Sequence, residues 1–331
     1  MNTSWDILLS EFRKLGGIAD NVFQKEGENG RGIFPVNPSL KARIFTPSKL
    51  MIKKDDIYLE KNNLRIKKDK EYDLEIRNFF NFYQDNFSWG SGGKETTEKF
   101  EIGLRLFNSN LKKLIKKYAL FDLEERHKEE WDNVIKDQFL NARAITVGNS
   151  LVIAPIWELV NHKVRSLPFL LNKEGISTPN YPASTSEIRF SYGNISPLKR
   201  FFSYGFFSEE TIVFSIPFSL KVENIGINIA CKGMALNNDS MKIERFGNKF
   251  ILEGLPIADI NNPKLPYYYF DQIIRKIGYM NITKDLLFKI LKLNIEIRKK
   301  IIDESNFIDN EVSNMLIKLL NYEINLISSH N

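Results

Sequence analysis

The chain has 331 residues, of which 43% are hydrophobic and 12% aromatic, a composition that excludes a disordered chain and can fill a core. Its one cysteine excludes an internal disulfide and a cysteine-rich zinc site, and we expect no metal. The net charge of +6 is modest for this length, and no basic run is interleaved with aromatic residues, so no nucleic-acid partner is expected. The length predicts two domains, or one domain with a large insertion.

The sequence contains no apolar span of about twenty residues, and its first residues form an amphipathic pattern without a signal-peptide core. We therefore expect a soluble cytoplasmic protein without a membrane partner. The first pattern predicts a helix that Thr3 or Ser4 caps and that the two glycines at 16 and 17 end. Its apolar positions share one face: Trp5, Leu8, Leu9, Phe12 and Leu15.

Residues 18–52 predict short strands joined by tight turns, because glycines and prolines interrupt the apolar runs. Within this part lies Asn29-Gly30-Arg31-Gly32. Glycine lets the backbone approach a ligand closely, so the motif could wrap a small molecule. An isolated Gly-x-Gly also recurs by chance as a plain turn, and both interpretations stay open on the residues alone.

Residues 61–71 are charged and predict a surface connection, after which apolar periodicity predicts helices over 74–87, 100–118 and 131–139. The glycine-rich residues 88–95 separate the first two helices. They do not fit a phosphate-binding loop, since Glu95 follows Lys94 where serine or threonine is needed. We expect a mobile loop there.

Residues 151–154 read as a buried strand that Pro155 ends, and the following apolar segment leads to Asn161 and His162. Polar side chains that leave a buried segment need hydrogen-bond partners. On the residues alone, a structural histidine or a turn-forming asparagine is the commoner explanation of such a pair, and a binding site is the alternative. Arg143, at the end of the preceding helix, fits a helix-end ion pair.

Two tyrosines each precede a glycine, Tyr192 before Gly193 and Tyr204 before Gly205, with Phe206 next. A chain can bend around a ligand at such positions, whereas two buried core aromatics are the alternative. Beyond them the pattern predicts strands over 211–218, 223–231 and 250–255, and helices over 267–277, 285–303 and 311–327. The second of these helices carries a basic face, either solvated or a docking face for an acidic protein: Lys289, Lys292, Arg298, Lys299 and Lys300.

In order and spacing, the Gly-x-Gly motif, the segment from Pro47 to Ile52, the Asn-His pair and the two Tyr-Gly pairs resemble the SET-domain methyltransferases. The subclass is that of the plant Rubisco large-subunit lysine methyltransferase and the actin-histidine methyltransferase. The resemblance implies an α+β fold, with a SET-domain β-fold containing a pseudoknot, a helical insertion and a mixed, largely helical C-terminal domain. It places the N-terminal part of the SET core in residues 1–59, the insertion in 60–138, the C-terminal part of the core in 139–207 and a substrate-recognition domain in 208–331.

The resemblance further implies an S-adenosylmethionine-dependent protein methyltransferase that acts on a lysine side chain of a protein substrate. Tyr192 is the expected catalytic residue, with its hydroxyl beside the transferred methyl. The residues expected to bind the cofactor are Asn29, Gly30, Arg31, Gly32, Arg143, Asn161, His162, Tyr204 and Phe206.

Two departures from the family keep alternatives open. The tyrosine that lines the substrate channel in the plant enzyme has no clear counterpart, with Phe169 and Tyr181 as possible replacements. Pro197 stands where relatives usually carry asparagine. The alternatives are a histidine or small-amine N-methyltransferase and a catalytically silent SET-like binding module.

Overall fold

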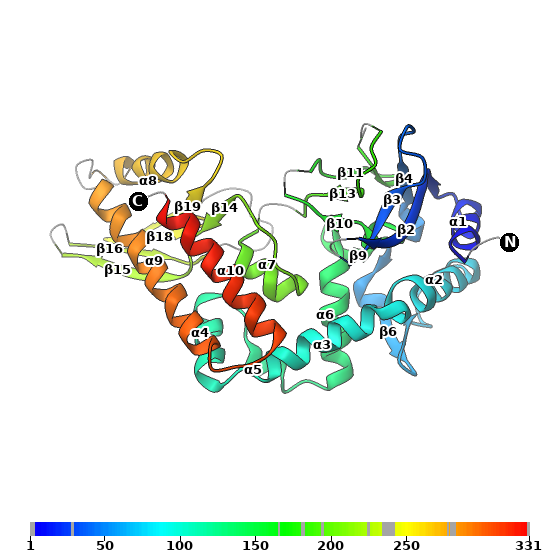
Figure 1. The fold of residues 1–331 in the computed structure, drawn as a ribbon, viewed down its shortest axis with the longest axis horizontal. Coiled ribbons are helices and arrows are strands. Elements are labelled where there is room, and N and C mark those ends of the chain that lie inside the picture. The colour runs from blue at the N-terminus through cyan, green and yellow to red at the C-terminus, as the bar shows by residue number, and fades with distance from the viewer. Residues whose placement is uncertain are drawn as a thin grey trace. The chain divides into compact units, whose positions relative to one another are not determined.

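The computed structural model describes residues 4–27, 30–164, 166–179, 183–192, 195–223, 226–233, 242–276, 278 and 283–329. Contacts divide the chain into two compact units, residues 1–98 with 130–192 and residues 99–129 with 193–331. The division falls within α3 (Lys94–Arg105). Both helices and strands contribute (Figure 1), so the predicted α+β class is confirmed.

The first unit combines small sheets with three longer helices. Its helices and irregular turns are α1 (Ser4–Lys14), η1 (Ser48–Leu50), η2 (Lys54–Asp56), α2 (Leu74–Phe87), η3 (Trp89–Gly93), α6 (Trp131–Arg143) and η4 (Trp157–Leu159). Its strands are β1 (Ile18–Asp20), β2 (Val22–Gly27), β3 (Gly30–Pro35), β4 (Arg43–Pro47), β5 (Ile52–Lys53), β6 (Ile57–Glu60), β7 (Asn63–Ile66), β8 (Ile145–Val147), β9 (Ser150–Ile153), β10 (Asn161–His162), β11 (Leu170–Leu171), β12 (Gly175–Ser177) and β13 (Arg189–Phe190).

The sheets of the first unit join strands that are far apart in sequence. One sheet has the order β1-β4-β12-β11 and another β5-β9-β8, while β2-β3 and β6-β7 are hairpins. The pair β10-β13 is parallel, with Asn161 opposite Arg189 and His162 opposite Phe190. This parallel pair places the residues just before Tyr192 beside the Asn-His pair.

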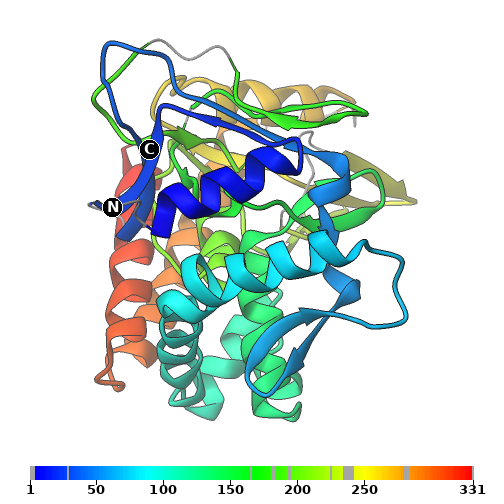
Figure 2. The ribbon, with the colours of Figure 1, turned by 90° about the vertical axis from the view of Figure 1, so that its right-hand side faces the viewer.

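Helices α1 and α2 lie side by side in the first unit (Figure 2), with the rings of Phe12 and Phe79 stacked 5.9 Å apart. The predicted apolar stripe of α1 is confirmed, because Leu8, Leu9 and Phe12 are buried. Strand β9 is found where it was predicted and ends at Ile153, two residues before Pro155, but only its second half is buried, since Leu151 is 40% exposed.

Two predictions for this unit were wrong. Residues 61–71 are not only a connection, because β7 pairs with β6 as a hairpin. Residues 88–95 form an irregular turn that is packed in place and leads directly into α3. The buried indole of Trp89 donates to the carbonyl oxygen of Asn62 at 2.7 Å, and a side chain at Gly93 would lie 2.6 Å from the Phe139 ring. An apolar anchor thus fixes a glycine-rich segment that composition alone suggested to be mobile.

The second unit contains a four-stranded sheet, a strand pair and the remaining helices. Its elements outside α3 are α4 (Ser109–Tyr118), α5 (Leu123–Arg126), α7 (Pro197–Tyr204), β14 (Ile212–Phe214), β15 (Phe218–Val222), β16 (Ile227–Cys231), β17 (Lys242–Phe246), β18 (Lys249–Glu253), β19 (Pro256–Asp259), α8 (Leu265–Lys276), α9 (Thr283–Ser305) and α10 (Glu311–Ser328). The sheet has the order β15-β16-β18-β17, and β14 pairs with β19. The three C-terminal helices were predicted to within a few residues.

The helix predicted over 100–118 is two helices, α3 and α4. The side chain of Asn108 caps α4 by accepting from the backbone N–H of Leu111 at 2.8 Å, which starts a new helix. The apolar spacing continues across this break because both helices face one core. That core includes Leu104 of α3, Leu111 of α4 and Phe201 of α7.

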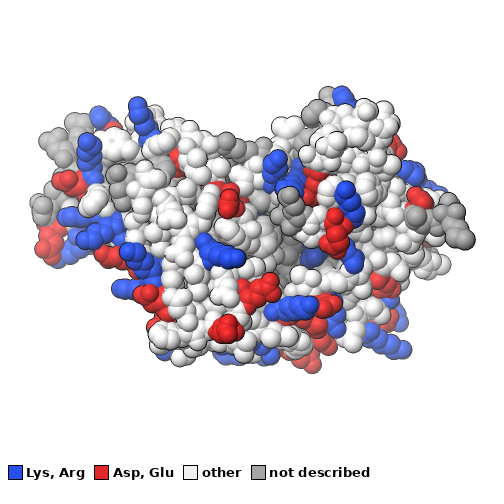
Figure 3. Space-filling model, in the orientation of Figure 1, with Lys and Arg blue, Asp and Glu red and all other residues white. Residues whose placement is uncertain are grey.

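The basic face of α9 is smaller than predicted. Lys289, Lys292, Lys299 and Lys300 are exposed, but Arg298 is fully buried and pairs with Glu323 of α10. Figure 3 shows Asp and Glu side chains interspersed with Lys and Arg on the face that carries α9. The mixed charge favours the solvated face over a docking face.

The two units cut across the four predicted segments, since residues of the expected insertion, 60–138, belong to both units. The four-part division therefore stays a prediction. Among the helices in the described ranges, none combines the length and the apolar character needed to cross a bilayer.

Candidate active site

The Asn-His pair and Tyr192 meet at one corner of the first unit. Nδ1 of His162 accepts a hydrogen bond from the backbone N–H of Tyr192 at 3.0 Å, and their rings are 5.0 Å apart. In the neutral imidazole this bond places the proton on Nε2. The Tyr192 hydroxyl donates to the carbonyl oxygen of Val160 at 2.9 Å. The tyrosine is therefore held at both its backbone and its phenol.

Asn161 ties β10 to the Gly-x-Gly strand. Its side-chain Nδ2 donates to the carbonyl oxygen of Arg31 at 3.0 Å and to Oε1 of Glu187 at 2.6 Å. A side chain at Gly32 would place its Cβ 2.0 Å from that Glu187 oxygen and 3.0 Å from Nδ2 of Asn161. The glycine at 32 is thus required by a close approach of protein groups.

An aromatic cluster centred on Phe190 adjoins the tyrosine. The ring of Phe190 lies 4.9 Å from Tyr192, 5.6 Å from Trp157 and 5.4 Å from Phe169. Trp157 and Phe190 are buried. Such walls exclude water, and their faces attract cations. Phe169, one of the two possible replacements for the channel tyrosine, lies in this cluster, whereas Tyr181 falls outside the described residues.

A buried polar network lies beneath the corner. Gln84 of α2 donates to Glu158 of η4 at 2.9 Å, and the backbone N–H of Ile156 donates to the hydroxyl of Tyr83 at 3.1 Å. Ile156 has a φ of +70°, which is strained for a β-branched residue and is maintained by the packing around it. The network joins α2 to the turn that delivers the Asn-His pair.

Arg143 lies over the ring of Phe139, with its guanidinium carbon 3.9 Å from the ring centroid. Among the described residues it forms no ion pair, so the helix-end ion pair is not found. Burial lowers the pKa of Arg143, while the negative charges of Glu158 and of ionised Tyr192 and Tyr83 would raise it. Arg143 thus lies within electrostatic range of the predicted catalytic tyrosine.

Replacing Glu158 with glutamine should flatten the pH dependence of stability. Burial raises the pKa of Glu158, and Arg143 opposes the shift. The folded protein therefore retains a proton that the unfolded chain loses near pH 4.3, so this group's contribution to stability falls as pH rises from there through the folded pKa. Urea unfolding measures the free energy of unfolding at pH 4.5 and at pH 7.5. Its decrease between these two pH values should be smaller in Glu158→Gln than in the unaltered protein.

The exposed Glu174 of the first unit provides the matched control. Glu174→Gln should keep the pH dependence of the unaltered protein. An equal pH dependence in Glu158→Gln would contradict the role given to the buried carboxyl.

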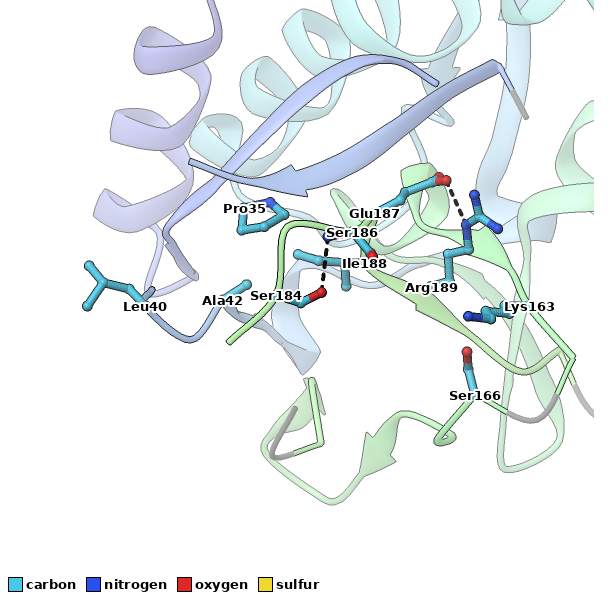
Figure 4. A pocket seen from close by; sticks show the side chains of 10 residues that line it. All are labelled: Pro35, Leu40, Ala42, Lys163, Ser166, Ser184, Ser186, Glu187, Ile188 and Arg189. Atoms are coloured by element: carbon cyan, nitrogen blue, oxygen red, sulfur yellow. Dashed lines mark hydrogen bonds and ion pairs between the residues drawn. The ribbon is translucent and has the colours of Figure 1, made fainter. Parts of the chain in front are cut away.

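A pocket of ≈ 230 Å³ adjoins this corner, and ten residues line it: Pro35, Leu40, Ala42, Lys163, Ser166, Ser184, Ser186, Glu187, Ile188 and Arg189. Figure 4 shows the ion pair between Arg189 and Glu187 on one side of it and Lys163 close to Ser166 on another. Charged heads and apolar side chains share its walls. The pocket therefore suits a polar group with an apolar stem.

The structure brings together most of the predicted site residues of the first unit: Arg31, Gly32, Arg143, Asn161, His162 and Tyr192. Gly30 begins β3 opposite Gly27 of β2, with a φ of +80° and open space where a side chain would be. The side chain of Arg31 pairs with Glu26 at 3.2 Å on that hairpin. Asn29 lies outside the described residues.

Tyr204 and Phe206 belong to the second unit, at the end of α7. Their rings are 6.1 Å apart, and the buried Arg200 lies 5.9 Å from the Tyr204 ring. Gly205 caps the helix with a φ of +76° and packs against Phe100. This glycine serves a helix end, and the cofactor role of the two aromatics stays a prediction.

Sequence reasoning missed Glu187, Glu158 and Gln84. One signal was present for Glu187, because a two-residue spacing places it on the same face of an extended segment as Arg189, of opposite charge. The sequence around Gln84 contained no such signal, because this residue lies on a helix that was predicted to belong to the insertion and not to the site. In the described part of the chain, no group of three or more His, Cys, Asp and Glu side chains could hold a metal.

No family model and no curated protein matches the chain. Solved structures are similar to it. The SET domain of LSMT bound to lysine and AdoHcy is 12% identical, with 98% of this chain and 89% of that chain covered and a TM-score of 0.45. Rubisco LSMT bound to AdoMet is 11% identical, with 100% and 91% covered and a TM-score of 0.45.

Rubisco LSMT bound to sinefungin and monomethyllysine is 13% identical, with 99% and 90% covered and a TM-score of 0.46. All three are structures of LSMT, so they concern the first of the two expected relatives and not the actin-histidine methyltransferase. At these identities and TM-scores, membership of the SET-domain family stays a prediction.

Proposed function

We propose that this chain is an S-adenosylmethionine-dependent protein methyltransferase of the SET type that methylates a lysine side chain. The observation that carries the proposal is the corner where His162 holds the backbone of Tyr192. The order of motifs in the sequence suggested that these residues form one site. Their hydrogen bonds join segments that are 30 residues apart in the chain, as that hypothesis requires.

Tyr192 is suited to orient an amine. Its hydroxyl hydrogen is committed to Val160, so the phenol oxygen keeps lone pairs that can accept from a substrate N–H. Accepting that bond turns the amine's own lone pair in a defined direction. Holding a nucleophile in line with its target removes part of the barrier without further chemistry by the protein.

The aromatic cluster supports the deprotonation of a lysine. The Phe190 ring covers one side of Tyr192 and is backed by Trp157 and Phe169, which keeps water away from that side. Desolvation penalises an ammonium and favours the neutral amine, which alone has a free lone pair. A histidine nucleophile would not need this desolvation to the same degree, because its imidazole is already largely neutral at pH 7, whereas a small amine would need it as lysine does.

The residues present fit the amino-acid end of the cofactor. In the part of the chain that the structure describes, Oδ1 of Asn161 has no hydrogen-bond partner, because both bonds of this side chain use Nδ2. A carbonyl oxygen accepts from an ammonium group. When bound, S-adenosylmethionine supplies a methyl on a positively charged sulfur, so that a nitrogen lone pair can displace a neutral thioether. The lysine ammonium would lose its proton to solvent before the attack, and the methylated product would leave as an ammonium that carries the positive charge from the sulfur.

Calorimetric titration with S-adenosylmethionine, followed by methyl transfer from labelled cofactor to host proteins, tests the proposal. Acid hydrolysis of the labelled proteins should release methyllysine. Methylhistidine would instead select the histidine alternative. Absence of cofactor binding would favour the catalytically silent module and end the proposal.

A further inference from the structure

Glu187 is a buried carboxylate at the centre of the corner, and nothing in the reaction itself requires it. Its side chain is 3% exposed. Oε1 accepts from Asn161 at 2.6 Å, and Oε2 accepts from Nε of Arg189 at 2.7 Å. A charge in this position is costly unless it is paired and hydrogen-bonded, and here it is both.

The two acceptors around Asn161 decide which way its amide faces. The carbonyl oxygen of Arg31 and the carboxylate of Glu187 can only accept, so both must meet Nδ2 and its two hydrogens. The carbonyl oxygen of Asn161 then faces away from both. With the Arg31 bond alone, the amide would be held at one point and could rotate.

The Gly-x-Gly strand leaves room for this arrangement. Strand β3 passes so close that a Cβ at position 32 would overlap the Glu187 carboxylate, at 2.0 Å from Oε1 and 2.7 Å from Cδ. The isolated bridge between Ile33 and Ile188 keeps the two segments in register. Gly32, Asn161 and Glu187 therefore form one packed unit.

We propose that Glu187 is a positioning residue that turns the Asn161 carbonyl oxygen toward the α-ammonium group of the cofactor. This inference rests on the proposed function. Arg189 holds the second carboxylate oxygen and balances the charge, so Glu187 does not compete for the ammonium itself. In this arrangement Gly32 is the space that the carboxylate occupies.

Glu187→Gln tests the inference, because a glutamine cannot accept from both Asn161 and Arg189. Its amide nitrogen would oppose one of these two donors. Calorimetry should show S-adenosylmethionine binding weakened roughly ten- to hundredfold, the usual effect of a misplaced hydrogen bond to a charged group. The turnover rate at saturating cofactor should change only a few-fold, and Glu174→Gln should behave as the unaltered protein.

A ligand without the amino group separates positioning from structural damage. 5′-Methylthioadenosine lacks the whole amino-acid end, so its affinity should be equal for the unaltered protein and for Glu187→Gln. Equal losses for both ligands would overturn the inference. So would S-adenosylmethionine binding in Glu187→Gln within twofold of the unaltered protein.

The close approach at Gly32 provides a second test, which does not depend on whether Glu187→Gln folds. Gly32→Ala should weaken cofactor binding, and Glu187→Asp, which withdraws the carboxylate by one methylene, should restore part of it in the double variant. Additive losses would contradict the packed unit. If the unaltered protein does not bind S-adenosylmethionine, the proposed function is overturned and this inference with it. If it binds the cofactor and substitutions at position 187 leave the affinity unchanged, only the inference is overturned.

Discussion

Tyr192→Phe should lower the rate of methyl transfer by about 100- to 1,000-fold, the usual cost of removing one hydrogen-bonding group aimed at the reacting atoms. The variant keeps the ring and its contacts with His162 and Phe190. It loses the oxygen that would accept from the substrate amine. Cofactor affinity should stay within a few-fold, because the hydroxyl is expected to face the amine. Single-turnover transfer of labelled methyl groups, with calorimetry in parallel, measures both quantities.

Loss of the hydroxyl also removes its bond to the Val160 carbonyl, which should cost about 1 kcal/mol of stability. Unfolding measurements on the variant separate this effect from the rate. Tyr268→Phe is the matched control, since that tyrosine is 58% exposed in the second unit. Turnover above a tenth of the normal rate in Tyr192→Phe would remove Tyr192 from the reaction.

Arg298→Met should destabilise the second unit by about 3–5 kcal/mol, the usual cost of leaving one partner of a buried ion pair alone. Arg298 and Glu323 are both fully buried, with Nε and Oε2 2.7 Å apart. The same guanidinium donates to Oδ1 of Asn294 at 2.9 Å and to the carbonyl oxygen of Phe214 at 3.1 Å. Its removal leaves the Glu323 carboxylate without its charged partner and takes one donor from each of these two acceptors, although Oδ1 of Asn294 still accepts from the backbone N–H of Ile216 at 3.0 Å. Chemical unfolding followed by circular dichroism measures the loss.

The double variant Arg298→Met/Glu323→Leu should regain most of this stability, because two apolar side chains in place of a buried pair are often neutral. Lys299→Met changes the neighbouring, exposed position of the same helix and should shift stability by less than about 0.5 kcal/mol. A cost below about 1 kcal/mol for Arg298→Met would show that the pair is not the anchor of α9 and α10.

Local patterns predicted the elements well where one face of the chain decides the structure. The apolar stripes of α1, α2 and α9 are readable because a period of 3.6 residues repeats several times in each. The same rule misplaced Arg298, since periodicity shows which face is buried but not that a charge on that face has found a partner. Trp89 illustrates the opposite case, in which one buried indole overrides the flexibility of five neighbouring glycine and serine residues.

For the candidate site, the order of the motifs predicted residues that the structure brings together, but it did not predict the groups that hold them. Asn161, His162 and Tyr192 were predicted from their order in the chain. Glu187 was missed although its neighbour Arg189 gave a local sign, since its other partner, Asn161, lies 26 residues away. Gln84 was missed because its partner is distant: Gln84 and Glu158 are separated by 74 residues. Contacts of that range depend on the assembled fold, and a single sequence carries no local trace of them.

The placement of β4 between β1 and β12 affects how the protein can be made. Ile44 and Thr178 are bonded neighbours although 134 residues separate them. At a synthesis rate of about 5–20 residues per second, β12 is made on the order of 10 s after β4. One edge of β4 therefore stays unpaired for that time. During that time a strand edge with free backbone groups is open to other nascent chains. Cells that produce this protein rapidly should therefore depend on chaperones that bind the emerging N-terminal half.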